Sequence, residues 1–271
     1  MSDALLEIRN LNVDYLLDDG AFRAVNDVSF EVRRGELFGL AGESGCGKST
    51  IAYAITRLSK PPAWVAGGEI LLDGQNLLKM PEASLQNVRW RRIGMVFQSA
   101  MNSLNPLMRV EAQFFDVLRK HTGATRPQAR ARTEEMFRLV GIPINRLDDY
   151  PHQFSGGMRQ RIVIAICLAL KPELIIMDEP TTALDVVVQR EILEQLVDLQ
   201  RNLGFSVLFI THDLHLMAQL CHRIGVMLKG QLVEVGDTQQ ISRAPEHDYT
   251  RKLWGAIPQL PSSVRSLGVV E

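Results

Sequence analysis

The sequence is poor in cysteine and contains no long apolar run. Its three cysteines, Cys46, Cys167 and Cys221, are widely separated and form no pair with the spacing of metal ligands. This usage excludes a disulfide framework and is typical of reduced thiols in a cytosolic protein. The longest uninterrupted apolar run, residues 162–170, is nine residues long, whereas a membrane-spanning helix needs about 20. We therefore expect a chain that does not cross a bilayer by itself.

An excess of charge of either sign is also absent. The 271 residues include 30 Lys and Arg against 31 Asp and Glu, so the chain has no diffuse basic footprint for nucleic acid. Residues 1–7 lack the basic and then apolar pattern of a secretion signal. We interpret the one basic cluster, residues 89–92, as the solvated entry to a strand. It has neither the aromatic platforms nor the further basic residues that a nucleic-acid contact needs.

Short apolar runs alternate with helical patterns along the chain, which predicts an α/β fold with a parallel sheet and helices on its faces. The stretch from about 99 to 172 has Met, Gln and Arg at helical spacing, and we interpret it as a mostly helical insertion. The remaining elements are predicted as strands at 5–13, 25–32, 37–41, 93–97, 174–177 and 206–210, a hairpin at 224–235, and helices from 49 to before Pro61, at 187–203 and at 249–257.

A glycine-rich loop between a predicted strand and a predicted helix fits the phosphate-binding pattern G-x-x-x-x-G-K-[ST]. Its glycines let backbone N–H groups converge on phosphate oxygens, and the following helix adds its positive N-terminal end. Lys48 would neutralise the β- and γ-phosphates, and Ser49 would ligate Mg²⁺. The candidate nucleotide-binding residues of this loop are Gly42, Glu43, Ser44, Gly45, Cys46, Gly47, Lys48, Ser49 and Thr50.

The buried strand at 174–177 delivers Asp178 and Glu179 to its carboxyl end, where ligands bind in open α/β sheets. Asp178 would hold Mg²⁺ through water, and Glu179 would activate a water molecule as a general base. Taken alone, Glu179 has a second interpretation as a helix-start acid before Pro180. Together the two motifs indicate a nucleoside triphosphatase or a kinase.

A second glycine-rich element, Ser155-Gly156-Gly157-Met158, precedes the apolar run at 162–170. A serine and two glycines ahead of a helix form another anion site rich in N–H groups. With this element the chain resembles the ATP-binding cassette (ABC) ATPases, whose signature is usually L-S-G-G-Q. The resemblance covers roughly residues 4–257.

The resemblance implies roles for four further residues. Gln98 matches the glutamine that contacts Mg²⁺ or water and senses the membrane partner, and Asp185 matches the D-loop aspartate. His212 matches the switch histidine that contacts the γ-phosphate, and Tyr15 matches the aromatic residue that stacks on adenine. The implied catalytic set is therefore Glu179, His212 and Gln98, and the implied metal-binding set is Ser49, Gln98 and Asp178.

The resemblance also implies an architecture and an assembly. The fold would be a P-loop NTPase core with a parallel sheet, an antiparallel β subdomain and a helical subdomain. Residues 1–257 would form a single ABC ATPase domain, with 258–271 as a short tail. Two such subunits would pair head to tail, with each ATP between the phosphate loop of one and the Ser155–Met158 element of the other.

Three segments are similar to the ATPases of dipeptide, oligopeptide and nickel importers: 98–106, 150–161 and 247–258. Met158 in place of the signature glutamine is typical of their D-type member. The chain departs from that subfamily at Asp248, where proline is usual, and it has no cysteine after Cys221. We therefore expect no iron–sulfur cluster.

The implied function is ATP hydrolysis that energises uptake of peptides or a related small solute, such as nickel or an oligosaccharide. The implied partners are a second ABC ATPase, either an F-type sister or an identical copy, two membrane permease subunits and, indirectly, a periplasmic or extracellular solute-binding protein. The chain would lie peripherally on the cytoplasmic face of the inner membrane, with ATP and Mg²⁺ as cofactors and no nucleic acid.

Two alternatives remain open at this point. One is a soluble ABC ATPase acting on nucleic acid or ribosomes, although the tandem cassettes, coiled-coil insertions or basic linkers usual in such proteins are missing here. The other is a non-catalytic subunit regulated by nucleotide. That interpretation conflicts with the joint presence of Lys48, Asp178, Glu179 and His212.

Overall fold

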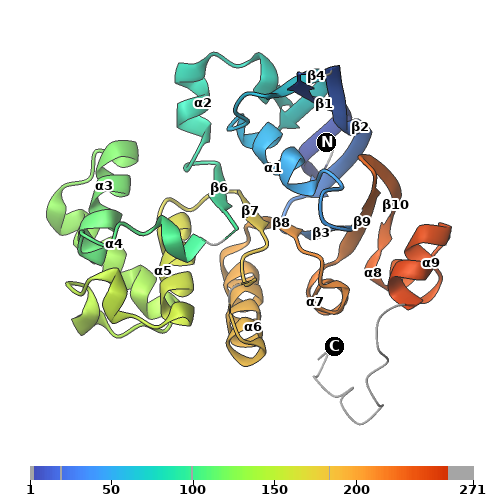
Figure 1. Cartoon of the computed structure of the whole chain (residues 1–271). Helices are drawn as coiled ribbons and strands as arrows, with labels where there is room; N and C mark the ends of the chain where they lie inside the picture. The colour runs from blue at the N-terminus through green and yellow to red at the C-terminus, as the bar shows by residue number, and fades with distance from the viewer. Residues whose placement is uncertain (1–2, 19, 99, 183, 256–271) are drawn as a thin grey trace, which may run out of the picture.

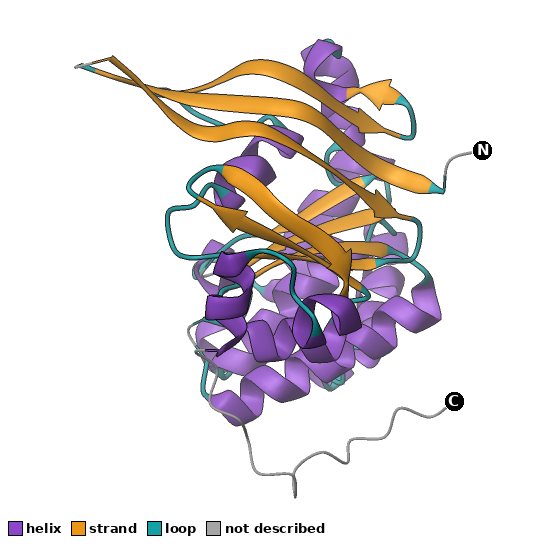
Figure 2. Ribbon diagram, turned by 90° about the vertical axis from the view of Figure 1, so that its right-hand side faces the viewer, coloured by secondary structure: helices purple, strands orange, loops and turns teal. Residues whose placement is uncertain are grey.

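The computed structural model describes residues 3–18, 20–98, 100–182 and 184–255. Its two sheets lie one above the other in Figure 2, and most of the helices cover the far face of the lower sheet. The upper, antiparallel sheet has the order β2-β1-β4-β5. Its strands are β1 (Ala4–Leu17), β2 (Gly20–Arg33), β4 (Ala63–Leu72) and β5 (Gln75–Asn76). The hairpin of β1 and β2 projects beyond the rest of the molecule (Figure 2).

The lower sheet has six strands in the order β10-β9-β3-β8-β7-β6. Neighbours from β9 to β6 are parallel, and β10 joins antiparallel after a turn at residues 229–230, as the sequence predicts. The strands are β3 (Leu37–Ala41), β6 (Ile93–Val96), β7 (Leu174–Asp178), β8 (Ser206–Ile210), β9 (Arg223–Leu228) and β10 (Gln231–Asp237).

The helices fall into two groups. From 100 to 168 the described chain is helical or loop, and this part lies to one side of the sheets in Figure 1. It contains η2 (Ala100–Ser103), α3 (Val110–Thr122), α4 (Arg126–Leu139), η3 (Ile144–Arg146), η4 (Pro151–Gln153) and α5 (Gly156–Leu168). The other helices are α1 (Lys48–Thr56), η1 (Leu77–Lys79), α2 (Glu82–Val88), α6 (Val186–Leu203), α7 (Leu214–Leu220), α8 (Thr238–Arg243) and α9 (Asp248–Gly255).

The fold class expected from the sequence is confirmed: a parallel α/β core, an antiparallel sheet and a helical part. No helix within the described ranges is long and apolar enough to span a membrane. The predicted tail, 258–271, and the last two residues of the helix predicted at 249–257 lie outside the described residues. The division into one domain and a tail stays a prediction.

The parallel strands are buried on both faces, which explains their continuous apolar sequences. Along β3, Phe38 and Leu40 face the core shared with α1 and the antiparallel sheet, whereas Leu37 and Ala41 face the helices of the opposite layer. β7 and β8 divide their side chains in the same way. The sheet is therefore held rigidly between two cores, and its carboxyl edge can position polar side chains.

Strand β4 is an element that the sequence analysis did not predict. Its Gly67-Gly68 pair and the preceding prolines conceal the strand pattern. Gly68 has a φ of +94°, and a Cβ atom there would lie 2.5 Å from the carbonyl oxygen of Asn10 in β1. Asn10 itself has a φ of +48°, and the register between β1 and β4 shifts after Arg9. This irregularity also breaks the alternation of β1, so the strand appears weak in the sequence.

The interpretation of the basic cluster 89–92 as a solvated strand entry is wrong for two of its arginines. Arg89 donates hydrogen bonds to the carbonyl oxygens of Thr56 and Arg57 at the end of α1. Arg92 donates to both carboxylate oxygens of Glu173 at 2.5 and 3.0 Å. The Arg92 guanidinium lowers the pKa of the Glu173 carboxyl. These arginines connect α1 and the sheet, and the sequence alone could not identify such distant acceptors.

Gly94 in β6 lies where the helical part meets the sheet, and a Cβ atom there would collide with Sγ of Cys167 in α5. We predict that Gly94→Ala lowers the free energy of unfolding by about 1–3 kcal/mol, because overpacking a close-packed core is destabilising. Urea unfolding measures it. Cys167→Ala removes the colliding sulfur. The loss in the free energy of unfolding of the double variant should therefore be smaller than the sum of the losses in the two single variants. Strictly additive effects would contradict this packing.

Candidate functional site

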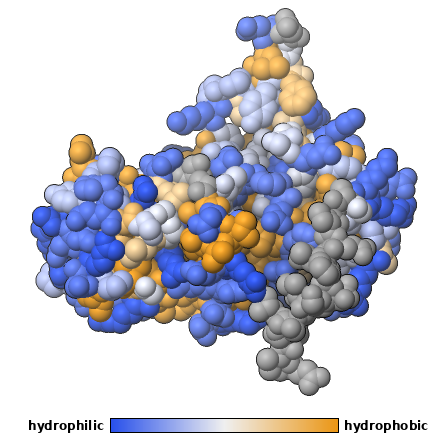
Figure 3. Space-filling model, turned by 60° about the horizontal axis from the view of Figure 1, so that its bottom comes forward, coloured by the Kyte–Doolittle hydropathy of each residue, from blue (hydrophilic) through white to orange (hydrophobic). Residues whose placement is uncertain are grey.

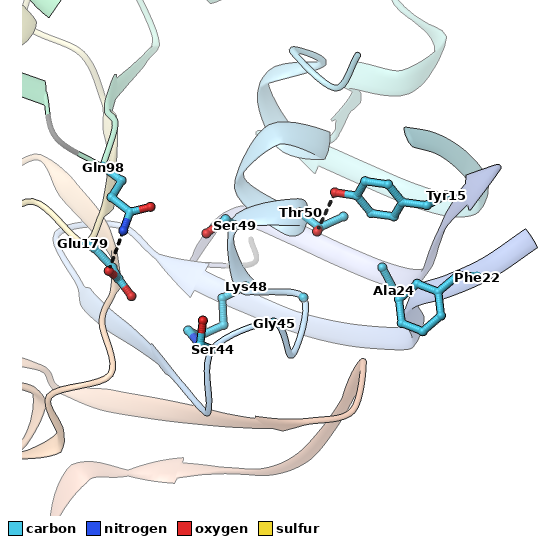
Figure 4. Close-up of a pocket in the computed structure, with 11 residues that line it drawn as sticks. Tyr15, Phe22, Ala24, Ser44, Gly45, Lys48, Ser49, Thr50, Gln98 and Glu179 are labelled. Carbon is cyan, nitrogen blue, oxygen red and sulfur yellow. Dashed lines mark hydrogen bonds between the residues drawn. The ribbon is translucent and has the colours of Figure 1, made fainter. Parts of the chain in front are cut away.

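A cavity of about 290 Å³ opens beside the loop between β3 and α1. Its two ends differ in chemistry: Gln98 and Glu179 lie at one end, and Tyr15 and Phe22 lie at the other (Figure 4). The lining residues are Tyr15, Phe22, Ala24, Ser44, Gly45, Gly47, Lys48, Ser49, Thr50, Gln98 and Glu179. The cavity thus has a polar, charged end and an aromatic end, with the glycine-rich loop between them.

The loop has a backbone that side chains cannot adopt freely. Gly42, Gly45 and Gly47 have φ angles of +144°, +80° and +106°. A Cβ atom on Gly47 would lie 2.5 Å from the carbonyl oxygen of Ala24. Gly47 also caps α1 without any side-chain hydrogen bond to the first turn. The N–H groups at the start of α1 are therefore left for an anion, as a phosphate site requires.

Lys48 places a buried cation at the loop. The residue is 5% exposed, and Nζ donates to the carbonyl oxygens of Gly42 at 2.7 Å and Glu43 at 2.8 Å. Lys48 forms no ion pair with a carboxylate among the residues that the structure describes. A buried ammonium is costly without an opposite charge. The loop therefore favours an anionic ligand.

Asp178 ends β7 and accepts a hydrogen bond from the Ser49 hydroxyl at 3.0 Å. Burial raises the pKa of the Asp178 carboxyl, and the hydrogen bond from Ser49 opposes that effect. A hydroxyl, a carboxylate and the amide oxygen of Gln98 are oxygen donors of the kind that Mg²⁺ prefers. In the described part of the chain no three His, Cys, Asp or Glu residues form a metal-binding group. The residues therefore fit a Mg²⁺ ion that is also held by phosphate and water.

Three side chains converge at the carboxyl edge of the sheet. Gln98 follows β6, Glu179 follows β7 and His212 follows β8. Gln98 Nε2 donates to Glu179 Oε2 at 3.0 Å, and His212 Nδ1 lies 3.2 Å from Glu179 Oε1. Because β6, β7 and β8 are adjacent and parallel, their carboxyl ends bring together residues that are 114 positions apart at the extremes. The carboxylate of Glu179 is the centre of this group.

The backbone of Glu179 lies in the left-handed region, with a φ of +45°. Such a conformation costs a non-glycine residue on the order of 1–3 kcal/mol and is concentrated at functional sites. The Glu179 N–H donates to the carbonyl oxygen of Ile210 at 2.8 Å, which fixes the residue against β8. The interpretation of Glu179 as a helix-start acid is not supported, because the next helix, α6, begins at Val186.

Tyr15 and Phe22 form the aromatic end of the cavity. They are cross-strand partners in the β1–β2 hairpin, and the Tyr15 hydroxyl lies 3.2 Å from Oγ1 of Thr50. Phe22 is 56% exposed, and the sequence analysis did not identify it. A turn signal near residues 18–20 could have found it, because Tyr15 and Phe22 pair across the hairpin that this segment joins. This end of the cavity offers an aromatic surface for a planar, apolar ligand group.

The signature element, Ser155 to Met158, does not line the cavity. Ser155 caps α5 by accepting a hydrogen bond from the Met158 N–H at 3.3 Å. A Cβ atom on Gly157 would lie 2.5 Å from Cγ1 of Val188, so α5 and α6 touch at this glycine. Asp185 caps α6 through the Val188 N–H at 3.0 Å. Gly156, next to Gly157, would place a Cβ atom 3.3 Å from Leu184. One chain does not bring these residues to its own phosphate loop.

Comparison with known proteins relates the chain to one family. A model of the ABC transporter family matches residues 25–182. The oligopeptide transport ATP-binding protein OppD of Bacillus subtilis is 45% identical over 262 residues, which are 96% of this chain and 73% of that protein. The dipeptide transport ATP-binding protein DppD of Escherichia coli K12 is 42% identical over 258 residues, 94% of this chain and 79% of that protein.

Solved structures give the same relationship. One is the dimeric, post-hydrolysis ATP-binding cassette MJ0796 bound to ADP and Pi, which superposes with a TM-score of 0.75 at 28% identity. The aligned region covers 86% of this chain and 98% of that cassette. The cassette cbiO1 of Clostridium perfringens, part of the transporter complex cbiONQ, has a TM-score of 0.75 at 27% identity and covers 95% and 97% of the two chains.

We predict that Lys48→Ala weakens Mg·ATP binding by more than about 10-fold, because a charged hydrogen bond contributes about 1.5–3 kcal/mol. Titration of the purified chain with a fluorescent ATP analogue measures the Kd. Lys60→Ala is the matched control, since Lys60 is exposed and does not line the cavity. Unaltered Mg·ATP affinity in Lys48→Ala, with wild-type behaviour of the control, would refute the role of this loop.

Proposed function

Since the chain belongs to the ABC transporter family, we propose that it is the ATP-hydrolysing subunit of an importer for peptides or a chemically related small solute. The observation that carries the proposal is the convergence of Gln98, Glu179 and His212 beside the loop of Lys48. The relatives named for oligopeptide and dipeptide transport support the solute class. Arg89 and Arg92 are engaged inside the protein, so no observation favours the nucleic-acid alternative.

The geometry of the cavity supports ATP as the ligand. The triphosphate would lie on the loop, where Lys48 and the N–H groups of α1 offer positive charge. The Ser49 hydroxyl, the Asp178 carboxylate and Gln98 would hold Mg²⁺, which would neutralise charge on the β- and γ-phosphates. The adenine would contact the aromatic end with Tyr15 and Phe22. The spacing of the two ends along one cavity supports this orientation (Figure 4).

Hydrolysis needs a base that accepts a proton from water while the water oxygen attacks the γ-phosphorus and ADP leaves. Glu179 is the residue proposed for this role. Gln98 and His212 hold its two oxygens at 3.0 and 3.2 Å, so the carboxylate is oriented before any substrate arrives. His212 would also contact the γ-phosphate, since it lies beside Glu179 at the end of β8.

The catalytic site would be shared between two ATPase subunits. Ser155, Gly156 and Gly157 lie at the N-terminus of α5 but do not line their own chain's cavity. They would bind the ATP held by the opposite subunit, and the dimeric cassette bound to ADP and Pi supports such pairing. Val186 and Val187, which follow Asp185, are 81% and 67% exposed. Their exposure suits burial against a second subunit.

The composition of the signature supports a non-identical partner. Met158 stands where the family usually has glutamine, and its sulfur lies 3.6 Å from Nη1 of Arg146. Arg146 lies over the ring of Phe154 at 4.2 Å and donates to the Gln153 carbonyl oxygen. The Met158 side chain is thus packed within its own subunit, and it has no side-chain amide to offer. An F-type sister with a complete signature would compensate, and a homodimer is the alternative outcome.

A second cavity, of about 320 Å³, lies between β6, η2, α3 and α5 and is largely apolar. Phe97, next to Gln98, lines it together with Leu104, Val117 and Val163. We propose that this cavity is the docking site of a short helix of a membrane permease. Docking there would place the chain on the cytoplasmic face of the membrane. Because Gln98 contacts Glu179, a helix seated here would sense the nucleotide site. Figure 3 shows apolar residues gathered near the middle of an otherwise largely hydrophilic face, as expected of a subunit with partners.

We predict that Glu179→Gln reduces the ATP turnover rate at least about 100-fold and retains Mg·ATP binding, because general-base catalysis contributes typically 10²–10⁴-fold. Phosphate release and nucleotide titration measure the two quantities. Glu194→Gln, an exposed change on α6, is the matched control. Normal turnover in Glu179→Gln would show that another group acts as the base.

We predict that Val117→Glu abolishes solute uptake by the assembled transporter, since a charge at a buried apolar contact disfavours docking. ATP hydrolysis by the pair of ATPase subunits without the permease should stay within about twofold. Uptake into reconstituted vesicles measures the effect. Lys120→Glu changes an exposed residue of the same helix that does not line the second cavity. This control variant should transport solute normally. Full solute uptake by Val117→Glu would exclude the second cavity as the docking site of the permease helix.

A further inference from the structure

The C-terminal helix α9 touches the phosphate loop. The backbone N–H of Glu43 donates a hydrogen bond to the Tyr249 hydroxyl oxygen at 3.3 Å. The two residues are 206 positions apart in the sequence. Tyr249 does not line the nucleotide cavity, and its hydrogen bond in this region is made to the loop backbone. Through this hydrogen bond Tyr249 can influence the nucleotide by way of the loop.

Glu43 is held from both sides of its backbone. Its N–H donates to Tyr249, and its carbonyl oxygen accepts from Lys48 Nζ at 2.8 Å. The same carbonyl accepts from the Cys46 N–H at 3.3 Å. A change in the orientation of Glu43 would therefore alter both the ammonium of Lys48 and the turn of the loop. Glu43 connects the C-terminal helix with the principal cation of the site.

A second contact from the C-terminal part of the chain reaches the other end of the same turn. Gly230, in the tight turn between β9 and β10, donates its N–H to the carbonyl oxygen of Cys46 at 3.2 Å. Gly42 is packed so closely against the Met227 carbonyl oxygen that a Cβ atom would collide with it. The C-terminal elements therefore hold the loop near Gly42 and at Cys46, and Tyr249 adds the contact at Glu43.

Helix α9 is itself fixed, so Tyr249 is a defined anchor. The Glu234 carboxylate in β10 accepts the N–H groups of Glu246 at 2.8 Å and His247 at 3.0 Å, just before the helix begins. Thr250 is fully buried, and the Tyr249 ring packs against the main apolar core. Burial raises the pKa of the Tyr249 hydroxyl above its ordinary value.

We propose that Tyr249 is a positioning residue for nucleotide binding, which acts through Glu43 to hold the phosphate loop and Lys48 in the receptive conformation. The inference rests on the proposed binding of ATP at this loop. It gives α9 a function beyond packing: a partner or ligand that displaced the helix would lower the affinity of the loop for nucleotide. The sequence motif 247–251 then has a role in this chain's own ATP site.

The test is Tyr249→Phe in the full chain, which removes the hydroxyl and keeps the ring. We expect the Kd for Mg·ATP and the KM for ATP to rise about 3- to 10-fold, the effect of losing one neutral hydrogen bond. The kcat should stay within about twofold, since the catalytic group at Glu179 is untouched. The urea unfolding curve should be unchanged, which separates positioning from a role in stability.

Arg251→Lys is the matched control, because Arg251 is an exposed residue of the same helix whose contacts are with Pro245 and Asp248. It should bind Mg·ATP like the wild type. Wild-type affinity in Tyr249→Phe would overturn the inference, and so would equal weakening in both variants. If wild type and Lys48→Ala bound Mg·ATP equally, the proposed function itself would fail. If Lys48→Ala alone lost binding, only the role of Tyr249 would be rejected.

Discussion

The buried ammonium of Lys48 is the interaction on which the rest of the nucleotide site depends. Two loop carbonyl oxygens hold it, and it forms no ion pair with a carboxylate of the described chain. The loop can adopt the required backbone only with glycine at three positions, and one of these, Gly47, leaves the start of α1 without a cap. The loop thus combines the Lys48 ammonium with free N–H groups at the start of α1. An anionic ligand would interact favourably with both.

The parallel sheet supplies the remaining chemistry. Its strands are buried on both faces, so their positions are set by two cores rather than by the ligand. The carboxyl ends of β6 and β7 deliver Gln98 and Glu179 to the side of the loop that Lys48 occupies. His212, after β8, joins them through its contact with Glu179. The strained backbone of Glu179 is tolerated because β8 holds its N–H. The rigid sheet therefore fixes the orientation of Glu179, the proposed base.

The sequence predicted the residues whose chemistry depends on local spacing, such as Lys48 and Asp178, and the strands whose side chains form continuous apolar runs. It did not reveal β4, because Gly68 and the bulge at Asn10 interrupt the alternation. It missed Phe22, whose role depends on cross-strand register. It also misjudged Arg92, since the carboxylate that it meets is 81 positions away. Contacts between distant segments are set by tertiary packing, which no local pattern encodes.

The most direct test of the account is a structure of the assembled transporter with ATP trapped in its closed state. The account predicts that the γ-phosphate lies within hydrogen-bonding distance of Lys48 on one side and of the signature serine and glycines of the opposite ATPase subunit on the other. Ser155, Gly156 and Gly157 of this chain should face the nucleotide of that partner. A closed, active complex in which each ATP contacts one subunit only would contradict the shared site.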